Sequence, residues 1–180
     1  MEEKAKKPRK KCIVIFFNLL GNAKMRLALF QPDIPQNTGT IIRLCACFNV
    51  PLDIIEPCGF IFSDTKLRRA GMDYYELAVI NRHNSWDKFK EKQKVNRIVL
   101  VTTKATQLIN TFKFSSNDTL LFGSESSGVP TFVHETISNR VRVPISASAR
   151  SLNVAVCASI ALWEAFRQES QSNDLLNDDQ

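Results

Sequence analysis

Apolar and polar positions follow two different periods along this chain, and the change of period predicts strands and helices in turn. Runs of apolar residues predict buried strands, whereas apolar residues three and four positions apart predict helices. We expect strands at residues 26–30, 52–55, 77–80, 97–102, 118–122 and 141–143. We expect helices from 37 or 38 to 48 and at 63–71, 85–94, 130–137 and 151–168. Central strands that are apolar on both faces and alternate with helices are typical of an α/β fold with a mainly parallel sheet flanked by helices.

The last predicted helix is apolar around its whole circumference. Between Leu152 and Phe166 most residues are apolar, and their spacing leaves no polar face. Such a helix must be buried on every side. In a domain of this size, that pattern favours contact of one face with a second subunit, and a central core helix is the alternative.

The amino-terminal 24 residues differ from the rest of the chain. Six Lys and Arg residues precede the apolar run 12–20, and the two segments together resemble a signal peptide. The run is too short to span a membrane, Asn18 interrupts it, and no small-residue cleavage site follows. We therefore expect residues 1–24 to be a basic extension outside the fold. The domain then covers residues 25–168, and residues 169–180 form an acidic, disordered tail.

Charge and cysteine content narrow the class of protein. The net charge is +6, and residues 25–167 hold 17 Lys and Arg against 12 Asp and Glu. A basic body permits a phosphate-rich partner without requiring one. The five cysteines form no C-x-x-C pair and only two histidines accompany them, which argues against a disulfide framework and a zinc site. We expect free thiols in a reducing cytoplasm, no metal and no membrane segment.

Three short stretches lie where a predicted strand leads into a predicted helix. They are Pro35-Gln36-Asn37-Thr38-Gly39 leading to Arg43, residues 121–130, and Val143-Pro144-Ile145 leading to Arg150-Ser151-Leu152-Asn153. Three of the six glycines fall in these stretches, which suggests close approach of a ligand to the backbone. Strand ends of this kind are where open α/β sheets bind ligands, so we expect one composite site there.

The residue types at these strand ends exclude several reactions. Gly123 and Gly128 resemble the start of a phosphate loop, but Val129-Pro130 replaces the required Lys and Ser or Thr, which argues against an NTPase. His83 and His134 lie on polar, helix-like stretches away from the three motifs, which argues against a histidine base. A backbone-lined pocket with polar residues at its rim suits methyl transfer from a sulfonium cofactor, which carries an already activated methyl group.

Taken together, these residues resemble the SPOUT superfamily of S-adenosylmethionine-dependent RNA methyltransferases. The likeness covers residues 25–168 and is closest to the small tRNA (cytidine/uridine wobble position) 2′-O-methyltransferases. The first motif, P-x-N-x-G-x-x-x-R, matches Pro35 to Arg43. The second, F-G-x-E-x-x-G-[LV]-P, matches Phe122 to Pro130, and the third, [IV]-P followed by R-S-x-N, ends at Asn153. Ile54-Ile55-Glu56-Pro57 and Leu67-Arg68-Arg69-Ala70-Gly71 match the subfamily's other segments.

The resemblance implies more than the pattern alone. It implies a carboxyl-terminal trefoil knot and an obligate homodimer whose active sites are completed across the interface. It implies that S-adenosylmethionine binds in a bent form, with S-adenosylhomocysteine as product. The backbone groups that would hold it lie at Val101, Gly123, Val143, Ile145, Ser151 and Leu152. The substrate would be tRNA, methylated on the ribose 2′-hydroxyl of its wobble nucleotide, a cytidine or modified uridine.

The resemblance also assigns roles to polar side chains. Arg43 would bind the phosphate or the 2′-oxygen and stabilise the developing alkoxide, and a helix-surface charge is the alternative. The other predicted catalytic residues are Asn37, Glu125, Ser151 and Asn153. Helix capping is the alternative for Asn37, an N-cap together with a polar residue of the first turn is the alternative for Ser151 and Asn153, and a structural role is the alternative for Glu125. The candidates for phosphate contact are Arg43, Lys66, Arg68, Arg69 and Arg150.

Two departures from the subfamily pattern keep other functions open. Ser126-Ser127 replaces the usual Thr-Arg, and residues 146–149 replace a segment that usually holds a Pro-Asp pair. A noncatalytic RNA-binding module on the same fold, or an enzyme for another tRNA or ribosomal RNA position, is therefore also possible. Relatives that act on ribosomal RNA often carry an extra amino-terminal domain. Residues 1–24 are too short for one, which favours the compact tRNA enzyme.

Overall fold

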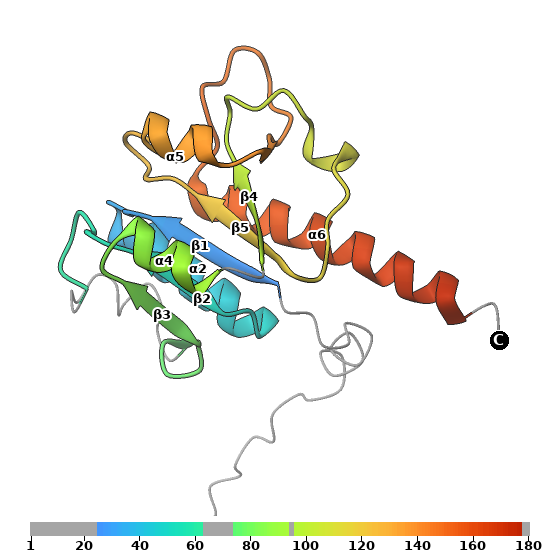
Figure 1. The fold of residues 1–180 in the computed structure, drawn as a ribbon, viewed down its shortest axis with the longest axis horizontal. Helices are drawn as coiled ribbons and strands as arrows, with labels where there is room; N and C mark the ends of the chain where they lie inside the picture. Colours follow the sequence, from blue (N-terminus) through green and yellow to red (C-terminus); the bar gives the residue numbers. More distant parts are fainter. Residues whose placement is uncertain (1–24, 63–73, 94–95, 178–180) are drawn as a thin grey trace, which may run out of the picture.

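A computed structural model describes residues 25–62, 74–93 and 96–177 of this chain (Figure 1). The described residues form a six-stranded sheet in the order β3-β2-β1-β5-β4-β6. The strands are β1 (Arg26–Phe30), β2 (Leu52–Ile55), β3 (Ile80–His83), β4 (Arg97–Val101), β5 (Asp118–Phe122) and β6 (Asn139–Val141). The helices are α2 (Pro35–Phe48), α4 (Trp86–Lys92), the 3₁₀ helix η2 (Ile109–Thr111), α5 (Thr131–Thr136) and α6 (Val154–Asn177).

Every strand pairs with its neighbours in parallel, so all carboxyl ends meet at one edge of the sheet. Alternate residues of β1 therefore enter two separate cores. Leu27 and Leu29 pack with residues of α2 and α6 on one face, whereas Ala28 and Phe30 pack with residues of α4 and α5 on the other. The helices cover both faces, as predicted from strands that are apolar on both sides.

The order of the strands reverses between β1 and β5. The chain proceeds from β1 outward to β2 and β3, and β4, β5 and β6 lie on the other side of β1. The helices that follow the two central strands, α2 and α5, cover opposite faces of the sheet. The carboxyl ends of β1 and β5, where the strand order reverses, are therefore the expected place of a ligand site, and the cavity described below lies beside them, at the ends of β4 and β5.

The two edge strands differ from the predicted ones. β3 covers Ile80–His83 rather than 77–80, and Leu77 and Val79 are exposed. The parallel register with β2, which pairs Ile55 with His83, decides where this strand lies. At the other edge, β6 covers Asn139–Val141 rather than 141–143.

Helix ends also depart from the predictions. α2 begins at Pro35, two residues before Asn37, because proline is favoured in the first turn of a helix. α6 begins at Val154 and continues to Asn177, so the helix bounds predicted at 151 and 168 are wrong, and the division of the chain into an extension, a domain and an acidic, disordered tail stays a prediction. Figure 1 shows the carboxyl-terminal part of α6 extending beyond the sheet. The helix predicted at 63–71 lies outside the described residues.

The apolar circumference of α6 divides into a buried and an exposed side. Four alanines together with Leu162 and Phe166 are buried against the core. Val156, Ile160 and Trp163 are 49%, 38% and 51% exposed. The alternative of a central core helix is therefore wrong, because one apolar side of α6 is exposed in the single chain. Within the described part, no helix has the length and hydropathy needed to span a membrane.

Candidate active site

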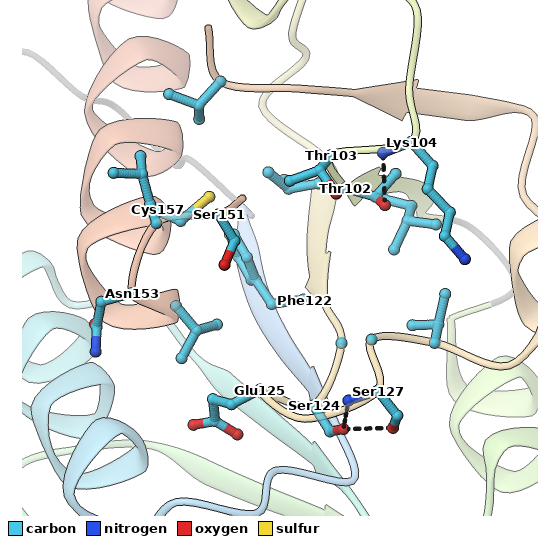
Figure 2. Close-up of a pocket in the computed structure, with 18 of the residues that line it drawn as sticks. Thr102, Thr103, Lys104, Phe122, Ser124, Glu125, Ser127, Ser151, Asn153 and Cys157 are labelled. Carbon is cyan, nitrogen blue, oxygen red and sulfur yellow. Dashed lines mark hydrogen bonds between the residues drawn. The ribbon is translucent and has the colours of Figure 1, made fainter. Parts of the chain in front are cut away.

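A cavity of about 490 Å³ opens at the carboxyl ends of β4 and β5 (Figure 2). Its walls come from residues within 100–104, 122–129, 143–145 and 151–157, with Ile34, Asn37 and His134. These segments are the ends of two neighbouring strands, the stretch after β6, and the start of α6. All three sequence motifs therefore contribute to one pocket.

The six residues predicted to bind cofactor all line this cavity: Val101, Gly123, Val143, Ile145, Ser151 and Leu152. Three of the predicted catalytic residues besides Ser151 line it as well: Asn37, Glu125 and Asn153. The prediction of one composite site at the strand ends is confirmed. The roles assigned to single residues stay predictions.

The turn after β5 forms a wall made of backbone. The Ser124 N–H donates to the Gly128 carbonyl at 3.1 Å, and the Gly128 N–H donates to the Ser124 carbonyl at 2.9 Å. A β-carbon on Gly123 would lie 2.4 Å from the carbonyl carbon of Gly128, so the turn closes only with glycine at 123. Gly128 itself has φ +71°, a left-handed conformation that glycine adopts without strain.

Asp33 holds this turn from the loop after β1. Its carboxylate accepts hydrogen bonds from the backbone N–H groups of Glu125 and Ser126, both at 3.2 Å. Its own N–H donates to the Glu125 carboxylate at 3.0 Å. The hydrogen bond with Glu125 holds the pKa of Asp33 below its usual value, whereas burial, followed by the contact with Asp33, raises the pKa of Glu125. As the pH falls, Glu125 takes up a proton before Asp33 does.

A chain of side-chain hydrogen bonds joins the three motifs. The Asn37 amide donates to Glu125 at 2.9 Å, and the Asn153 amide donates to the Asn37 carbonyl oxygen at 2.9 Å. The Asn153 carbonyl oxygen accepts from the N–H groups of Ala155 at 2.9 Å and Val156 at 3.3 Å, at the start of α6. Asn153 therefore caps α6, so the helix start predicted at Ser151 lies three residues later, at Val154. The capping alternative for Asn37 is wrong, because no side chain caps α2.

The predicted arginines within the described residues do not line this cavity. Arg43 is exposed on α2, with its guanidinium 4.8 Å from the centre of the Tyr74 ring. Neither Arg43 nor the exposed Arg150 lines the cavity. Lys66, Arg68 and Arg69 lie outside the described residues.

The two histidines also differ from expectation. His134 lines the cavity, and its Nδ1 lies 3.1 Å from the guanidinium of Arg140, so its predicted distance from the motifs is wrong. His83 lies on β3 rather than on a helix-like stretch, buried, with its Nε2 2.7 Å from the Asp53 carboxylate. Asp53 also accepts from Arg26, which makes this a structural network outside the cavity.

Several residues of the site have no signature in the sequence. Asp33, Thr102, Thr103, Lys104 and Cys157 belong to none of the matched motifs, yet Asp33 holds the turn and the others line the cavity. The position of 102–104 directly after a central strand was the signal that could have identified that segment. The described residues contain no group of three His, Cys, Asp or Glu side chains placed to hold a metal ion.

This parallel α/β fold is similar to the folds of solved RNA methyltransferases. One neighbour comes from work on the 2-OH methylation of C/U34 on tRNA, with a TM-score of 0.79, 36% identity and coverage of 82% of this chain and 97% of that one. The SpoU methyltransferase AviRb from Streptomyces viridochromogenes, in complex with AdoMet, has a TM-score of 0.71 at 26% identity over 81% of this chain and 58% of its own.

This chain belongs to the SpoU rRNA Methylase family, which it matches over residues 24–163. The tRNA (cytidine(34)-2′-O)-methyltransferase of Beijerinckia indica is 51% identical over 144 residues, covering 79% of this chain and 90% of the relative. The protein of the same name from Escherichia coli (strain K12) is 36% identical over 156 residues, covering 86% and 99%. The resemblance seen in the motifs is confirmed.

Proposed function

We propose that this chain transfers a methyl group from S-adenosylmethionine to the ribose 2′-hydroxyl of the wobble nucleotide of tRNA, a cytidine or modified uridine. The observation that carries the proposal is the joining of three distant motifs along one cavity, through Glu125, Asn37 and Asn153. Relatives that align over nearly their whole length carry the corresponding name. We propose that the enzyme acts in the cytoplasm.

The cavity fits the cofactor in size and lining. Small-molecule pockets typically measure about 300–1,000 Å³, and this one falls within that range. Gly123 and Gly128 carry no side chain in this turn, so a ligand can approach the backbone there, between the side chains of Ser124, Glu125 and Ser127. We assign the holding of S-adenosylmethionine to Val101, Gly123, Val143, Ile145, Ser151 and Leu152. When bound, the cofactor supplies an activated methyl group, so the protein's task is orientation.

The exposed side of α6 suits a second copy of this chain. Val156, Ile160 and Trp163 form an apolar stripe, and α2, which carries Arg43, packs beside α6. Arg43 lies outside the cavity of its own chain, which supports a site completed across a dimer interface. A guanidinium stays protonated in proteins, so Arg43 orients the hydroxyl and stabilises the developing alkoxide rather than acting as a base.

The remaining residues of the site position these groups. Glu125 and Asn37 hold the first motif against the second, and Asn153 holds the third motif against Asn37. Ser151 lines the cavity beside them and contacts the target ribose in this proposal. Arg150, Arg68 and Arg69 supply phosphate contacts, which would make tRNA binding weaken steeply with salt.

The proposal includes the carboxyl-terminal knot. The segment after β6 is held to the connection between β4 and β5, because Arg142 donates to Gln107 and accepts from Ile109, both at 2.9 Å. α6 then packs against η2 of the same connection, and the Phe114 N–H donates to Gln168 at 3.1 Å. The chain therefore contacts the connection between β4 and β5 twice, first through the segment after β6 and then through α6. Threading of the chain through this loop requires such contacts.

The test is transfer of radiolabelled methyl from S-adenosylmethionine to unmodified tRNA, followed by nucleoside analysis. We expect a labelled 2′-O-methylpyrimidine at the wobble position, and loss of about 100-fold or more in rate for Arg43→Ala. The matched control is Arg82→Ala, since the Arg82 guanidinium also lies over an aromatic ring, Phe62, at 4.7 Å, on the far strand β3. Label on ribosomal RNA instead of tRNA would show that ribosomal RNA is the substrate. Absence of cofactor binding, with no transfer to any RNA, would support the noncatalytic RNA-binding module.

A further inference from the structure

Lys104 is the only lysine or arginine among the described residues that line the cavity. Figure 2 shows it across the pocket from Ser151 and Cys157, with its side chain extending from the 102–104 segment in the direction of the Ser124–Ser127 turn. The side chain is exposed and makes no ion pair within the described part of the chain. A lysine in this position is available to a ligand.

The base of Lys104 is fixed to the sheet. The Thr102 N–H donates to the Val141 carbonyl of β6 at 2.9 Å, and the Lys104 N–H donates to the Thr102 hydroxyl at 3.3 Å. The segment is therefore tied to the strand ends that form the cavity floor. The side chain of Lys104, a residue that lines the cavity, therefore starts from a held backbone rather than from a free loop.

Lys104 forms no ion pair with the one carboxylate that the described residues place in the lining of the cavity. The one carboxylate in the lining belongs to Glu125, which already accepts from the Asp33 N–H and the Asn37 amide. An anion that enters a partly enclosed site needs a charged or hydrogen-bonding partner to offset its desolvation. Lys104 offers that partner to an anionic group of the bound molecule.

We propose that Lys104 binds the α-carboxylate of S-adenosylmethionine and so fixes the amino-acid end of the cofactor. This inference rests on the proposed function and assigns a residue outside all three motifs to the cofactor site. Lys104 then selects the complete cofactor over adenosine derivatives that lack the carboxylate. A charge-assisted contact of this kind orients the cofactor, because adenosine contacts alone leave the amino-acid end free to rotate.

The experiment compares Lys104→Met with the unchanged protein on two ligands. Calorimetry measures the Kd of S-adenosylhomocysteine, which carries the carboxylate, and of 5′-methylthioadenosine, which lacks the amino-acid part. Met keeps the unbranched, flexible shape of the side chain, one atom shorter, and removes the charge. We expect about a tenfold weaker Kd for S-adenosylhomocysteine and an unchanged Kd for 5′-methylthioadenosine. Decarboxylated S-adenosylmethionine, which lacks only the carboxylate, should behave like the second ligand.

Two variants and one kinetic measurement make the result decisive. Lys113→Met removes another exposed lysine of the same connection, outside the cavity, and should change neither Kd. Lys104→Arg should restore most of the affinity for S-adenosylhomocysteine. Equal weakening of both ligands by Lys104→Met would overturn the inference, and so would a raised KM for tRNA with unchanged cofactor affinity, which would assign Lys104 to an RNA phosphate. An unchanged protein that binds none of the ligands would overturn the proposed function as well.

Discussion

Replacing Gly123 by alanine tests whether the backbone turn after β5 builds the cavity. The new β-carbon would lie 2.4 Å from the carbonyl carbon of Gly128 and 2.7 Å from both the Gly128 Cα and the Val129 nitrogen. All three are backbone atoms, so no side chain can rotate away. Relief of the closest contact needs a backbone displacement of about 1 Å, since ordinary carbon contacts lie at about 3.5 Å or more.

The expected cost follows from the contacts that this displacement breaks. Forced overpacking costs roughly 1–3 kcal/mol. The two hydrogen bonds between Ser124 and Gly128 contribute about 1 kcal/mol each. We expect Gly123→Ala to lower the free energy of unfolding by about 3–5 kcal/mol and to weaken S-adenosylhomocysteine binding at least tenfold.

The assay is urea denaturation combined with calorimetry, and Gly128→Ala is the matched control. A β-carbon at Gly128 meets no atom within 4 Å, so only its φ of +71° is unfavourable, which costs about 1–2 kcal/mol. The reasoning is refuted if Gly123→Ala is no more destabilising than Gly128→Ala, or if it binds the cofactor product as tightly as the unchanged protein.

Three further outcomes follow from the geometry. Asp33→Asn replaces a carboxylate that accepts two backbone N–H groups by an amide with one acceptor oxygen, so urea denaturation should show a loss of about 1–2 kcal/mol; an unchanged midpoint would exclude the clamp. Burial raises the pKa of Glu169, so the native state keeps this proton to a higher pH than the unfolded chain, and stability relative to Glu169→Gln should fall as the pH rises above 4.5; a constant difference would contradict it. Burial also raises the pKa of Cys157 to about 11, so a thiol reagent at neutral pH should label exposed Cys47 first. S-adenosylhomocysteine should slow the labelling of Cys157 further, and equal labelling rates of Cys157 with and without this ligand would argue against its place in the cavity wall.

The central strands were predictable because burial on both faces leaves a plain signal. The predicted bounds of β1, β2 and β5 match the structure, and β4 ends one residue earlier than predicted. The edge strands have no such signal. β3 reads Ile-Asn-Arg-His and owes its place to pairing with β2, whereas the apolar residues just before it are exposed.

The residues of the site also fall into those that the sequence could predict and those that it could not. Residues that belong to recurrent motifs could be named from the sequence, since their types and spacing mark close backbone approach. The partnership of Asp33 with Glu125 could not, because it joins residues 92 positions apart through the orientation of two loops. The same holds for Lys104 and His134, whose place in the wall depends on how β4 and α5 are set beside the turn.

Both the oxygen and the NH₂ group of the Asn153 side-chain amide form hydrogen bonds. Its oxygen stabilises the first turn of α6, and its NH₂ group donates to Asn37. Both sets of hydrogen bonds therefore fix the orientation of the amide, because exchanging its oxygen and its NH₂ group would break both sets. Aspartate would preserve the cap but place a charge against the Asn37 oxygen, and serine would preserve the cap while being too short to span the gap. The folding of the longest helix and the alignment of the catalytic motifs thus depend on one side chain, so a weakened start of α6 would also misalign the pocket.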